Sequence, residues 1–323
     1  MLSVVDRGGL YLPDCGLWMD PRRAKPFAVV SHAHADHTAR HQSYLATAPT
    51  IDCMRVRMGN ALADRGVALA YGEVYQHGAV RIELFPAGHV LGSAMVRLET
   101  PSGESLLYTG DFKTRPGLAA ESIVIPQADT LIMESTFGLP EFVFPPTEVL
   151  QEQIRNFCVD ALEAGEVPVL LAYSFGKAQE VLKILEPCGF TVMAHKTIRA
   201  LNPVYAQHGI PMPDTRPLDF LNMQKCVVVM PPTVRQLLPQ GRQRLAMVSG
   251  WGLQGSSKYR YRTDVVLPLS DHADYPELLK FVDQVAPKKV FTVHGSTSTF
   301  AAELRRRGVD AWSLSGHDQL ELL

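Results

Sequence analysis

Short apolar runs separated by turn-forming residues dominate the first third of this 323-residue chain. Between residues 10 and 98, runs such as 28–31 and 80–85 are interrupted by glycine, proline and aspartate, which predicts a layer rich in strands. Apolar runs at 106–109 and 130–133 continue the same pattern. We therefore expect the first part of the chain to be built mainly from β-strands.

The spacing of apolar residues becomes helical after Pro146. Residues 147–163 carry apolar side chains at helical intervals, and Gly165 follows as a residue that can end a helix. The later elements that we predict here are a strand at 167–172, a helix at 177–185 and a strand at 227–230. Such alternation of strands and helices is typical of α/β structure and is compatible with a separate lobe.

The last part of the chain returns to the earlier pattern. The predicted elements are a strand at 265–269, a helix at 275–285, a strand at 289–293 and a helix at 299–307. The whole chain is therefore expected to be of the α/β class.

Three of the eleven histidines lie within six residues, directly after the apolar run at 27–30. On an extended segment His32 and His34 project to the same side, so both imidazoles can bind one cation. Asp36 and His37 follow and can face a second cation. The alternative is a polar loop in water, but so many metal-ligating groups at one strand end favour a metal site.

Three later strand ends supply further candidate ligands. His89 lies in a glycine-rich turn, Asp111 ends the apolar run at 106–109, and His294 ends the run at 290–293. Taken singly, His89 and Asp111 could be ordinary turn residues. The repeated placement at strand ends favours one shared site, in which the two oxygens of Asp111 could bridge two ions.

Two other residues, Glu134 and His272, suit proton transfer. A buried glutamate at a strand end requires a partner, and a glutamate–histidine pair would hold an imidazolium ready to donate a proton. The alternatives are an exposed Glu134 and a helix-capping role for Ser270 or Asp271. The remaining histidines that we considered are interpreted as surface or packing residues: His41, His77, His208 and His317.

Composition limits the kinds of partner. The 31 lysines and arginines against 33 acidic residues give a net charge of −2, so any nucleic-acid site must be local. The five cysteines are scattered and never form a CxxC pair, which argues against a disulfide framework and favours a reducing, cytoplasmic setting. No apolar run approaches the ~20 residues needed to span a bilayer, so neither export nor a membrane partner is expected.

Two segments could supply local contacts to nucleic acid. Residues 258–262 alternate cations with aromatic residues, a composition suited to phosphates and stacked bases, although a solvated edge strand is the alternative. Lys177 at a helix start could help to seat a phosphate, or it could be a plain surface lysine. The residues that we expect to contact nucleic acid are Ser174, Lys177, Lys258, Tyr259, Arg260 and Arg262.

These motifs together resemble a known superfamily. His-x-His-x-Asp-His at 32–37, His89 before x-x-Gly-Ser, Asp111 after Thr-Gly and His294 before glycine resemble the metallo-β-lactamase superfamily. Glu134 in Glu-Ser-Thr-Phe-Gly and the motifs at 174–180 and 270–274 resemble its β-CASP nuclease branch, which includes mRNA 3′-end processing factors and Artemis-like nucleases. Over nearly the whole chain, the likeness is greatest to bacterial ligase-associated DNA exonucleases.

The resemblance implies a metal site and a fold. It implies His32, His34 and His89 on one metal, Asp36, His37 and His294 on the other, Asp111 bridging, and Glu134 orienting His272 as general acid. Two divalent ions are expected; zinc suits these ligands and manganese is possible. The implied fold is an αββα metallo-β-lactamase sandwich from residues 1–146 and 264–323, with a smaller α/β β-CASP domain at 147–263 inserted into it.

The same resemblance implies a two-metal nuclease that cuts phosphodiester bonds, in particular a DNA exonuclease in DNA repair or processing. The implied catalytic residues are Asp36, Asp111, Glu134 and His272. The implied substrate is single-stranded or end-containing DNA. It also implies a DNA ligase and a helicase as protein partners. Histidine at position 294 leaves RNA processing as an alternative. A small-molecule ester or lactam hydrolase, which predicts an apolar pocket, and a metal-free nucleic-acid-binding scaffold are further alternatives.

Overall fold

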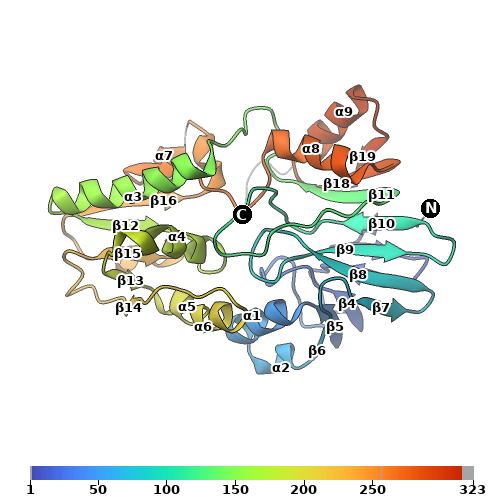
Figure 1. Cartoon of the computed structure of the whole chain (residues 1–323), viewed down its shortest axis with the longest axis horizontal. Coiled ribbons are helices and arrows are strands. Elements are labelled where there is room, and N and C mark those ends of the chain that lie inside the picture. Colours follow the sequence, from blue (N-terminus) through green and yellow to red (C-terminus); the bar gives the residue numbers. More distant parts are fainter. Residues whose placement is uncertain (1, 256, 315–323) are drawn as a thin grey trace. The chain divides into compact units, whose positions relative to one another are not determined.

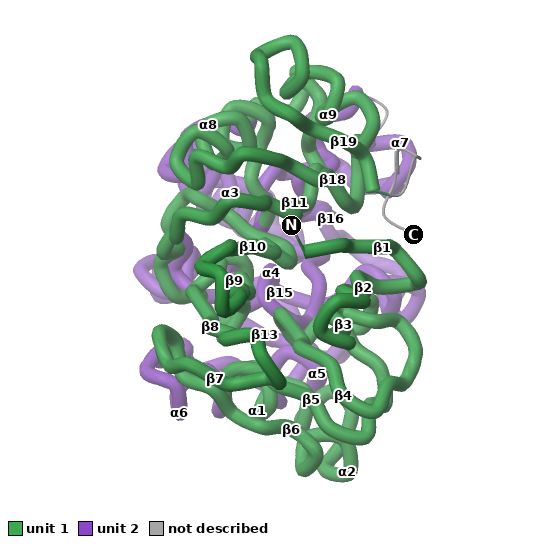
Figure 2. The backbone as a smooth tube through the Cα atoms, turned by 90° about the vertical axis from the view of Figure 1, so that its right-hand side faces the viewer, with its two compact units in different colours: residues 1–116, 120–143, 272–323 green, residues 117–119, 144–271 purple. Residues whose placement is uncertain are grey.

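A computed structural model describes residues 2–255 and 257–314, and their helices and strands appear in Figure 1. The chain divides into two compact units, shown in Figure 2. Unit 1 comprises residues 1–116, 120–143 and 272–323, and unit 2 comprises 117–119 and 144–271. The structure is of the mixed α/β class, as the sequence predicts, and the described residues form three sheets. His317, interpreted above as a surface or packing residue, lies outside the described residues.

The first sheet of unit 1, here called sheet A, joins six neighbouring strands in chain order. They are β1 (Val5–Asp6), β2 (Leu10–Leu12), β3 (Leu17–Met19), β4 (Phe27–Val29), β5 (Ser43–Ala46) and β6 (Gly66–Ala68). Strands β1 to β3 pair antiparallel, and β3 to β6 pair parallel. Helices α1 (Ala48–Met58) and α2 (Asn60–Ala63) lie between β5 and β6 in the chain.

The second sheet of unit 1, sheet B, has the strand order β19-β18-β11-β10-β9-β8-β7. The bounds are β7 (Val74–His77), β8 (Val80–Pro86), β9 (Ala94–Glu99), β10 (Ser105–Tyr108), β11 (Thr130–Ser135), β18 (Lys289–Gly295) and β19 (Ala311–Ser313). Strands β7 to β10 form an antiparallel meander, whereas β10, β11, β18 and β19 run parallel. Because parallel strands end at the same edge, β10, β11 and β18 deliver their last residues to one place.

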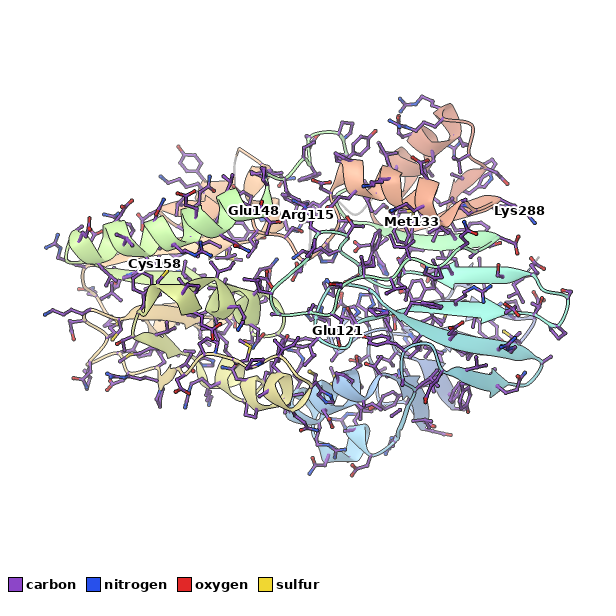
Figure 3. The ribbon with its side chains drawn as sticks, in the orientation of Figure 1. Arg115, Glu121, Met133, Glu148, Cys158 and Lys288 are labelled. Atoms are coloured by element: carbon purple, nitrogen blue, oxygen red, sulfur yellow. The ribbon has the colours of Figure 1, made fainter. Side chains whose placement is uncertain are left out.

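Two apolar layers hold unit 1 together. One layer joins sheets A and B face to face, with Leu17 from sheet A and Ile82 and Tyr108 from sheet B fully buried in it. The other layer packs the far face of sheet B, including Met133 (Figure 3), against helices α8 (Tyr275–Val285) and α9 (Thr297–Arg306). Asp274 begins α8 with a capping box closed by Glu277.

Unit 2 contains a six-stranded, all-parallel sheet with the order β14-β13-β15-β12-β16-β17. Its strands are β12 (Val167–Leu171), β13 (Val192–Ala194), β14 (Arg216–Pro217), β15 (Val227–Met230), β16 (Gln243–Val248) and β17 (Val265–Leu267). Its helices are α3 (Thr147–Glu163), α4 (Lys177–Leu185), α5 (Lys196–Arg199), α6 (Asn202–Gln207) and α7 (Ser257–Tyr261). Apolar clusters cover both faces of the sheet, as parallel strands require, and Cys158 of α3 lies in one of them (Figure 3).

Most of the predicted helices and strands are confirmed. The helices predicted at 147–163, 177–185 and 275–285 have these limits in the structure. The last helix begins at Thr297 rather than at residue 299. Residues 258–262 do not form an edge strand, because 257–261 are helix α7. Arg235 explains this helix end: its guanidinium donates to the carbonyls of Tyr261 and Arg262, which lack helical partners.

All five cysteines are free thiols, and three of them are buried. Within the described ranges, the helices lack the combination of length and apolarity that a membrane crossing requires.

Helix α3 offers a matched test of where unit 2 derives its stability. Ile154 is fully buried in its core, whereas Val149 on the same helix is 42% exposed. We expect Ile154→Ala to lower the free energy of unfolding by about 2–5 kcal/mol, because it leaves a cavity. Val149→Ala should change it by no more than about 0.5 kcal/mol. Urea unfolding followed by circular dichroism measures both, and equal effects would contradict the packing described.

Candidate metal centre

The histidine-rich loop follows strand β4 in sheet A. Val30 continues the buried run, Ser31 and His32 are buried, and the chain then turns, with the His37 amide donating to the His34 carbonyl at 3.2 Å. The loop is anchored through Ser31, whose amide and hydroxyl donate to the carboxylate of Asp20 at 2.7 and 2.5 Å. The loop is therefore held at the edge where sheets A and B meet.

Four of the predicted ligands come together from both sheets of unit 1. The ligand atoms of His32, His34, His89 and Asp111 all lie within 4.8 Å of one another. Nε2 of His32 is 2.9 Å from Nδ1 of His34, which in turn is 3.1 Å from Nε2 of His89. Nitrogens this close around a carboxylate are suited to share one cation, and three imidazoles with one carboxylate match zinc chemistry.

Asp111 also faces the other candidate ligands. Its Oδ2 lies 3.4 Å from Nε2 of His37 and 3.5 Å from Nε2 of His32. His37 Nε2 is 3.6 Å from the Asp36 carboxylate, and the rings of His37 and His294 have centroids 5.4 Å apart. One oxygen of Asp111 thus faces both groups of imidazoles, as a bridging ligand would.

Asp20 is a site residue to which the sequence interpretation gave no role. Its buried carboxylate accepts from Nδ1 of His37 at 2.8 Å and from the Tyr108 hydroxyl at 2.9 Å, in addition to Ser31. This contact leaves Nε2 of His37 to face Asp111, the arrangement in which a carboxylate orients a metal-binding histidine. The available signal was an aspartate directly after the buried strand β3 and before Pro21.

Burial and neighbouring charges shift the pKa of several of these groups toward the protonation state that binds a cation. Burial lowers the pKa of His32 well below its ordinary value, and His37 lowers it further. Burial also lowers the pKa of His294, so both imidazoles favour the neutral form that binds metal. Burial alone would raise the pKa of Asp111, but the nearby imidazoles, His37 and His272 foremost, hold it well below its ordinary value.

His37 behaves in the opposite way. Burial alone would lower the pKa of His37, but the carboxylates of Asp111 and Asp20 outweigh it and raise the pKa well above its ordinary value. A cation that binds Nε2 must displace this proton, so binding there is favoured as the pH rises.

Glu134 and His272 form the predicted pair. Nδ1 of His272 lies 2.9 and 3.0 Å from the two oxygens of Glu134. The buried carboxylate also accepts from the Phe112 amide at 2.8 Å and from the Thr136 hydroxyl, so its position is fixed. His272 also approaches His89, with ring centroids 4.8 Å apart. Glu134 thereby holds Nδ1 of His272 and fixes the orientation of the ring.

A cavity of about 390 Å³ lies beside this centre within unit 1. Asp36, His37 and His294 form one part of its wall, and the turn at Gly8 and Gly9 forms another. Its remaining lining mixes charged and apolar side chains: Asp6, Leu10, Met19, Asp20, Arg22, Tyr108, Val293 and Thr297, with the backbone of Gly295. Several charged groups in the wall do not fit the apolar pocket that a small-molecule ester or lactam hydrolase would need.

The residues predicted to contact nucleic acid all belong to unit 2. The hydroxyl of Ser174 is 2.8 Å from that of Thr197. Lys177 is buried rather than exposed, and its ammonium donates to the Leu269 carbonyl at 2.9 Å and to Asp271 at 2.8 Å. This ammonium already has two acceptors, so its contacts differ from those of the predicted phosphate seat.

The other four residues predicted to contact nucleic acid lie in helix α7 or directly after it. Lys258, Tyr259, Arg260 and Arg262 are all exposed, and Tyr259 is the most open of them at 84%. In a helix, residues two positions apart point to different sides, so the alternation of cations and aromatic residues does not place them on one face.

Comparison with known proteins finds sequence similarity to a metallo-hydrolase domain and to proteins named for DNA or RNA. Residues 259–314 match the family model described as "Zn-dependent metallo-hydrolase RNA specificity domain". A protein of Opitutus terrae named "Probable DNA ligase" is 43% identical over 97% of this chain and 31% of its own length. The "RNase J-like protein" of Methanocaldococcus jannaschii is 31% identical over 57% of this chain and 50% of its own length.

More distant similarities extend over most of the chain. The human "DNA cross-link repair 1A protein" is 24% identical over 81% of this chain and 27% of its own length. A crystal structure of a protein of unknown function from Enterococcus faecalis has the same fold, with a TM-score of 0.60 at 17% identity, over 83% of this chain and 75% of that one. The chain spans 27% to 50% of the length of the three relatives compared by sequence.

The Asp20 contact can be tested by metal binding. Asp20→Asn removes the negative charge that holds His37, so we expect the affinity for zinc to fall by about 10–100-fold. Competition with a chromophoric chelator measures this affinity, and circular dichroism checks folding. Asp14→Asn is the control, because this carboxylate is exposed and accepts from the Ser3 amide in the same part of sheet A. Equal zinc affinity in both variants would refute the orienting role of Asp20.

Proposed function

We propose that this chain, which is related by sequence to the β-CASP branch of the metallo-β-lactamase superfamily, is a nuclease that uses two divalent metal ions to hydrolyse phosphodiester bonds in DNA. The observation that carries the proposal is the convergence of four buried or half-buried ligand groups within 4.8 Å, around a carboxylate that also faces a second group. Asp111, whose pKa is held well below its ordinary value, lies with His32 and His294, whose imidazoles favour the neutral form, and such a donor set suits these ions.

We assign His32, His34 and His89 to one ion, Asp36, His37 and His294 to the other, and Asp111 to both. Imidazole and carboxylate ligands favour zinc, and manganese would accept the same set. Divalent ions bound here would supply Lewis acidity to a phosphate group and make water more acidic. The number and identity of the ions belong to the proposal.

His272 is proposed as the general acid. A phosphodiester bond breaks with charge on the leaving sugar oxygen, which needs a proton from a group within hydrogen-bond reach. The contact of Nδ1 with Glu134 fixes the ring of His272, and Nε2 is the atom that we assign as the donor. Glu134 acts through His272 and is a positioning residue.

DNA is the favoured substrate. The relatives that align with most of this chain carry the names "Probable DNA ligase" and "DNA cross-link repair 1A protein". We therefore propose a DNA exonuclease of repair or processing that acts on single-stranded or end-containing DNA and works together with a DNA ligase. A helicase partner stays a prediction of the motif resemblance.

RNA cleavage is the second candidate function. The matched family model is described as an RNA specificity domain, and a second relative is named "RNase J-like protein". End-labelled DNA and RNA, each single-stranded and duplex, distinguish the candidates when incubated with the zinc- or manganese-loaded protein. Stepwise shortening of DNA supports the exonuclease, and cleavage of RNA alone would replace it with the ribonuclease.

The two units are proposed to correspond to the family's domains. Unit 1, with two facing sheets and helices α8 and α9 on the far side of sheet B, would be the αββα sandwich. Unit 2, residues 117–119 and 144–271, would be the inserted β-CASP domain. The predicted limits of 147 and 263 for this insertion stay predictions.

Replacing the bridging carboxylate tests the metal assignment. Asp111→Asn removes the charge that both ions would share, so we expect loss of both metal equivalents and of DNA cleavage. Elemental analysis of the purified protein measures the metals, and an end-labelled oligonucleotide measures cleavage. Asp283→Asn on the exposed side of α8 is the control and should retain both. Full cleavage by Asp111→Asn would end the assignment.

Leaving groups of different acidity test His272. We expect His272→Ala to keep its metals but to cleave DNA about 10²–10⁴-fold more slowly, because the leaving oxygen lacks its proton donor. With a p-nitrophenyl ester of thymidine 5′-phosphate the deficit should shrink, since nitrophenolate leaves without a proton. A deficit of the same size for both substrates would show that another group is the acid.

A further inference from the structure

The outward face of strands β2 and β3 carries two aromatic side chains in register. Leu10, Leu12, Leu17 and Met19 point into the core, which leaves Tyr11 and Trp18 on the opposite face of sheet A. Tyr11 pairs directly with Trp18 across the two strands, and their ring centroids are 4.5 Å apart with planes tilted by 31°. Both rings are partly exposed, so they form a small aromatic surface outside the core.

Basic side chains surround these rings. The Arg7 guanidinium lies 5.5 Å from the centroid of Tyr11, and Nζ of Lys25 lies 3.4 Å from the centroid of Trp18. Arg22 and Arg23, which follow β3, are exposed. Within residues 2–255 and 257–314, these four cations form no ion pair with a carboxylate, although the chain as a whole has a net charge of −2.

Nearby carboxylates offset only part of this charge. Asp6 accepts from the amides of Gly8 and Gly9 at 2.9 and 3.4 Å, and Asp14 accepts from the Ser3 amide at 2.6 Å, so both carboxylates are held without an ion pair to these cations. Asp20 is buried with its four donors. The four cations outnumber these three carboxylates, so the patch keeps a small net positive charge that complements a polyanion.

This patch is continuous with the cavity beside the candidate metal centre. Gly8, Gly9 and Arg22 line that cavity together with His37 and His294. The turn is pressed against the chain after β3, because a Cβ on Gly9 would lie 2.4 Å from Cα of Pro21. The same short segments thus form the edge of the patch and the wall of the cavity.

We infer that this patch, comprising Arg7, Tyr11, Trp18, Arg22 and Lys25, is a binding surface for a single strand of nucleic acid that leads into the cavity. The inference rests on the proposed function. Bases would stack on Tyr11 and Trp18, with Lys25 moving aside from the ring that it covers, and phosphates would contact the three cations around them. A duplex presents no unstacked bases, so it can use the cations but not the rings.

Binding measurements test the patch on the metal-loaded full chain. The probe is fluorescein-labelled phosphorothioate oligo(dT), which resists cleavage, with fluorescence anisotropy at several salt concentrations. The triple variant Arg7→Gln/Arg22→Gln/Lys25→Gln should bind at least about tenfold more weakly and should lower the salt slope by about 2, since each lost phosphate contact contributes ~0.7. The control is Arg81→Gln/Lys280→Gln/Arg306→Gln, which removes the same charge from exposed positions elsewhere in unit 1.

The aromatic residues are tested separately. Tyr11→Ala and Trp18→Ala should each weaken binding of the single strand by about tenfold, and a duplex of the same length by much less. Trp18→Phe should retain most of the affinity, which separates stacking from loss of folding. Unchanged affinity in the triple variant and in both alanine variants, or equal losses for duplex and single strand, would overturn the inference.

A different measurement addresses the proposed function alone. Hydrolysis of bis(p-nitrophenyl) phosphate by the wild-type protein needs the metal centre but no extended strand. Hydrolysis together with normal oligonucleotide binding by the triple variant refutes the patch and keeps the nuclease. Absence of hydrolysis, together with weaker binding by the triple variant, refutes the nuclease and keeps the patch.

Discussion

Asp111 must stay ionised although it is buried, and the organisation of the centre follows from this requirement. A buried carboxylate without compensating charge takes up a proton, but Asp111 is surrounded by imidazoles within 3.4 to 3.8 Å of its Oδ2. Those imidazoles are themselves crowded, and His37, which has a second carboxylate behind it, is driven toward the charged form. The centre thus combines one buried carboxylate with several imidazoles, a set of groups that can bind cations.

The fold makes this set possible by ending strands of two sheets at one edge. Strand β4 of sheet A delivers His32 and its neighbours, while β10, β11 and β18 of sheet B end near Asp111, Glu134 and His294. The buried layer between the sheets, with Leu17, Ile82 and Tyr108, keeps these strand ends in place. Tyr108 connects the two roles, since its ring belongs to that layer and its hydroxyl donates to Asp20.

Each unit has its own hydrophobic core, and the polar groups that the two units contain are different. All predicted metal ligands lie in unit 1, where the loop at 32–37 is tied to Asp20 and the His272 ring to Glu134. Unit 2 contributes a parallel sheet with apolar clusters on both faces, and its Lys177 is committed to Leu269 and Asp271. The aromatic pair on sheet A adds a partly exposed surface to unit 1, next to the cavity beside the candidate metal centre.

The sequence by itself determined the ligand types and the long elements. Imidazoles and carboxylates at strand ends have few other uses, and helices such as 147–163 and 275–285 have strong periodicity, so local patterns were sufficient. Only the tertiary structure decided which groups pair. Asp20 lies next to His37 because β3 and the loop after β4 are neighbours in sheet A, and Lys177 is buried with Leu269 and Asp271 as acceptors, which the position at a helix start did not indicate. Residues 257–261 are helical, and Arg235, which is distant in the chain, donates to the carbonyls of Tyr261 and Arg262 at the end of this helix. Such long-range contacts leave no periodic trace in the sequence.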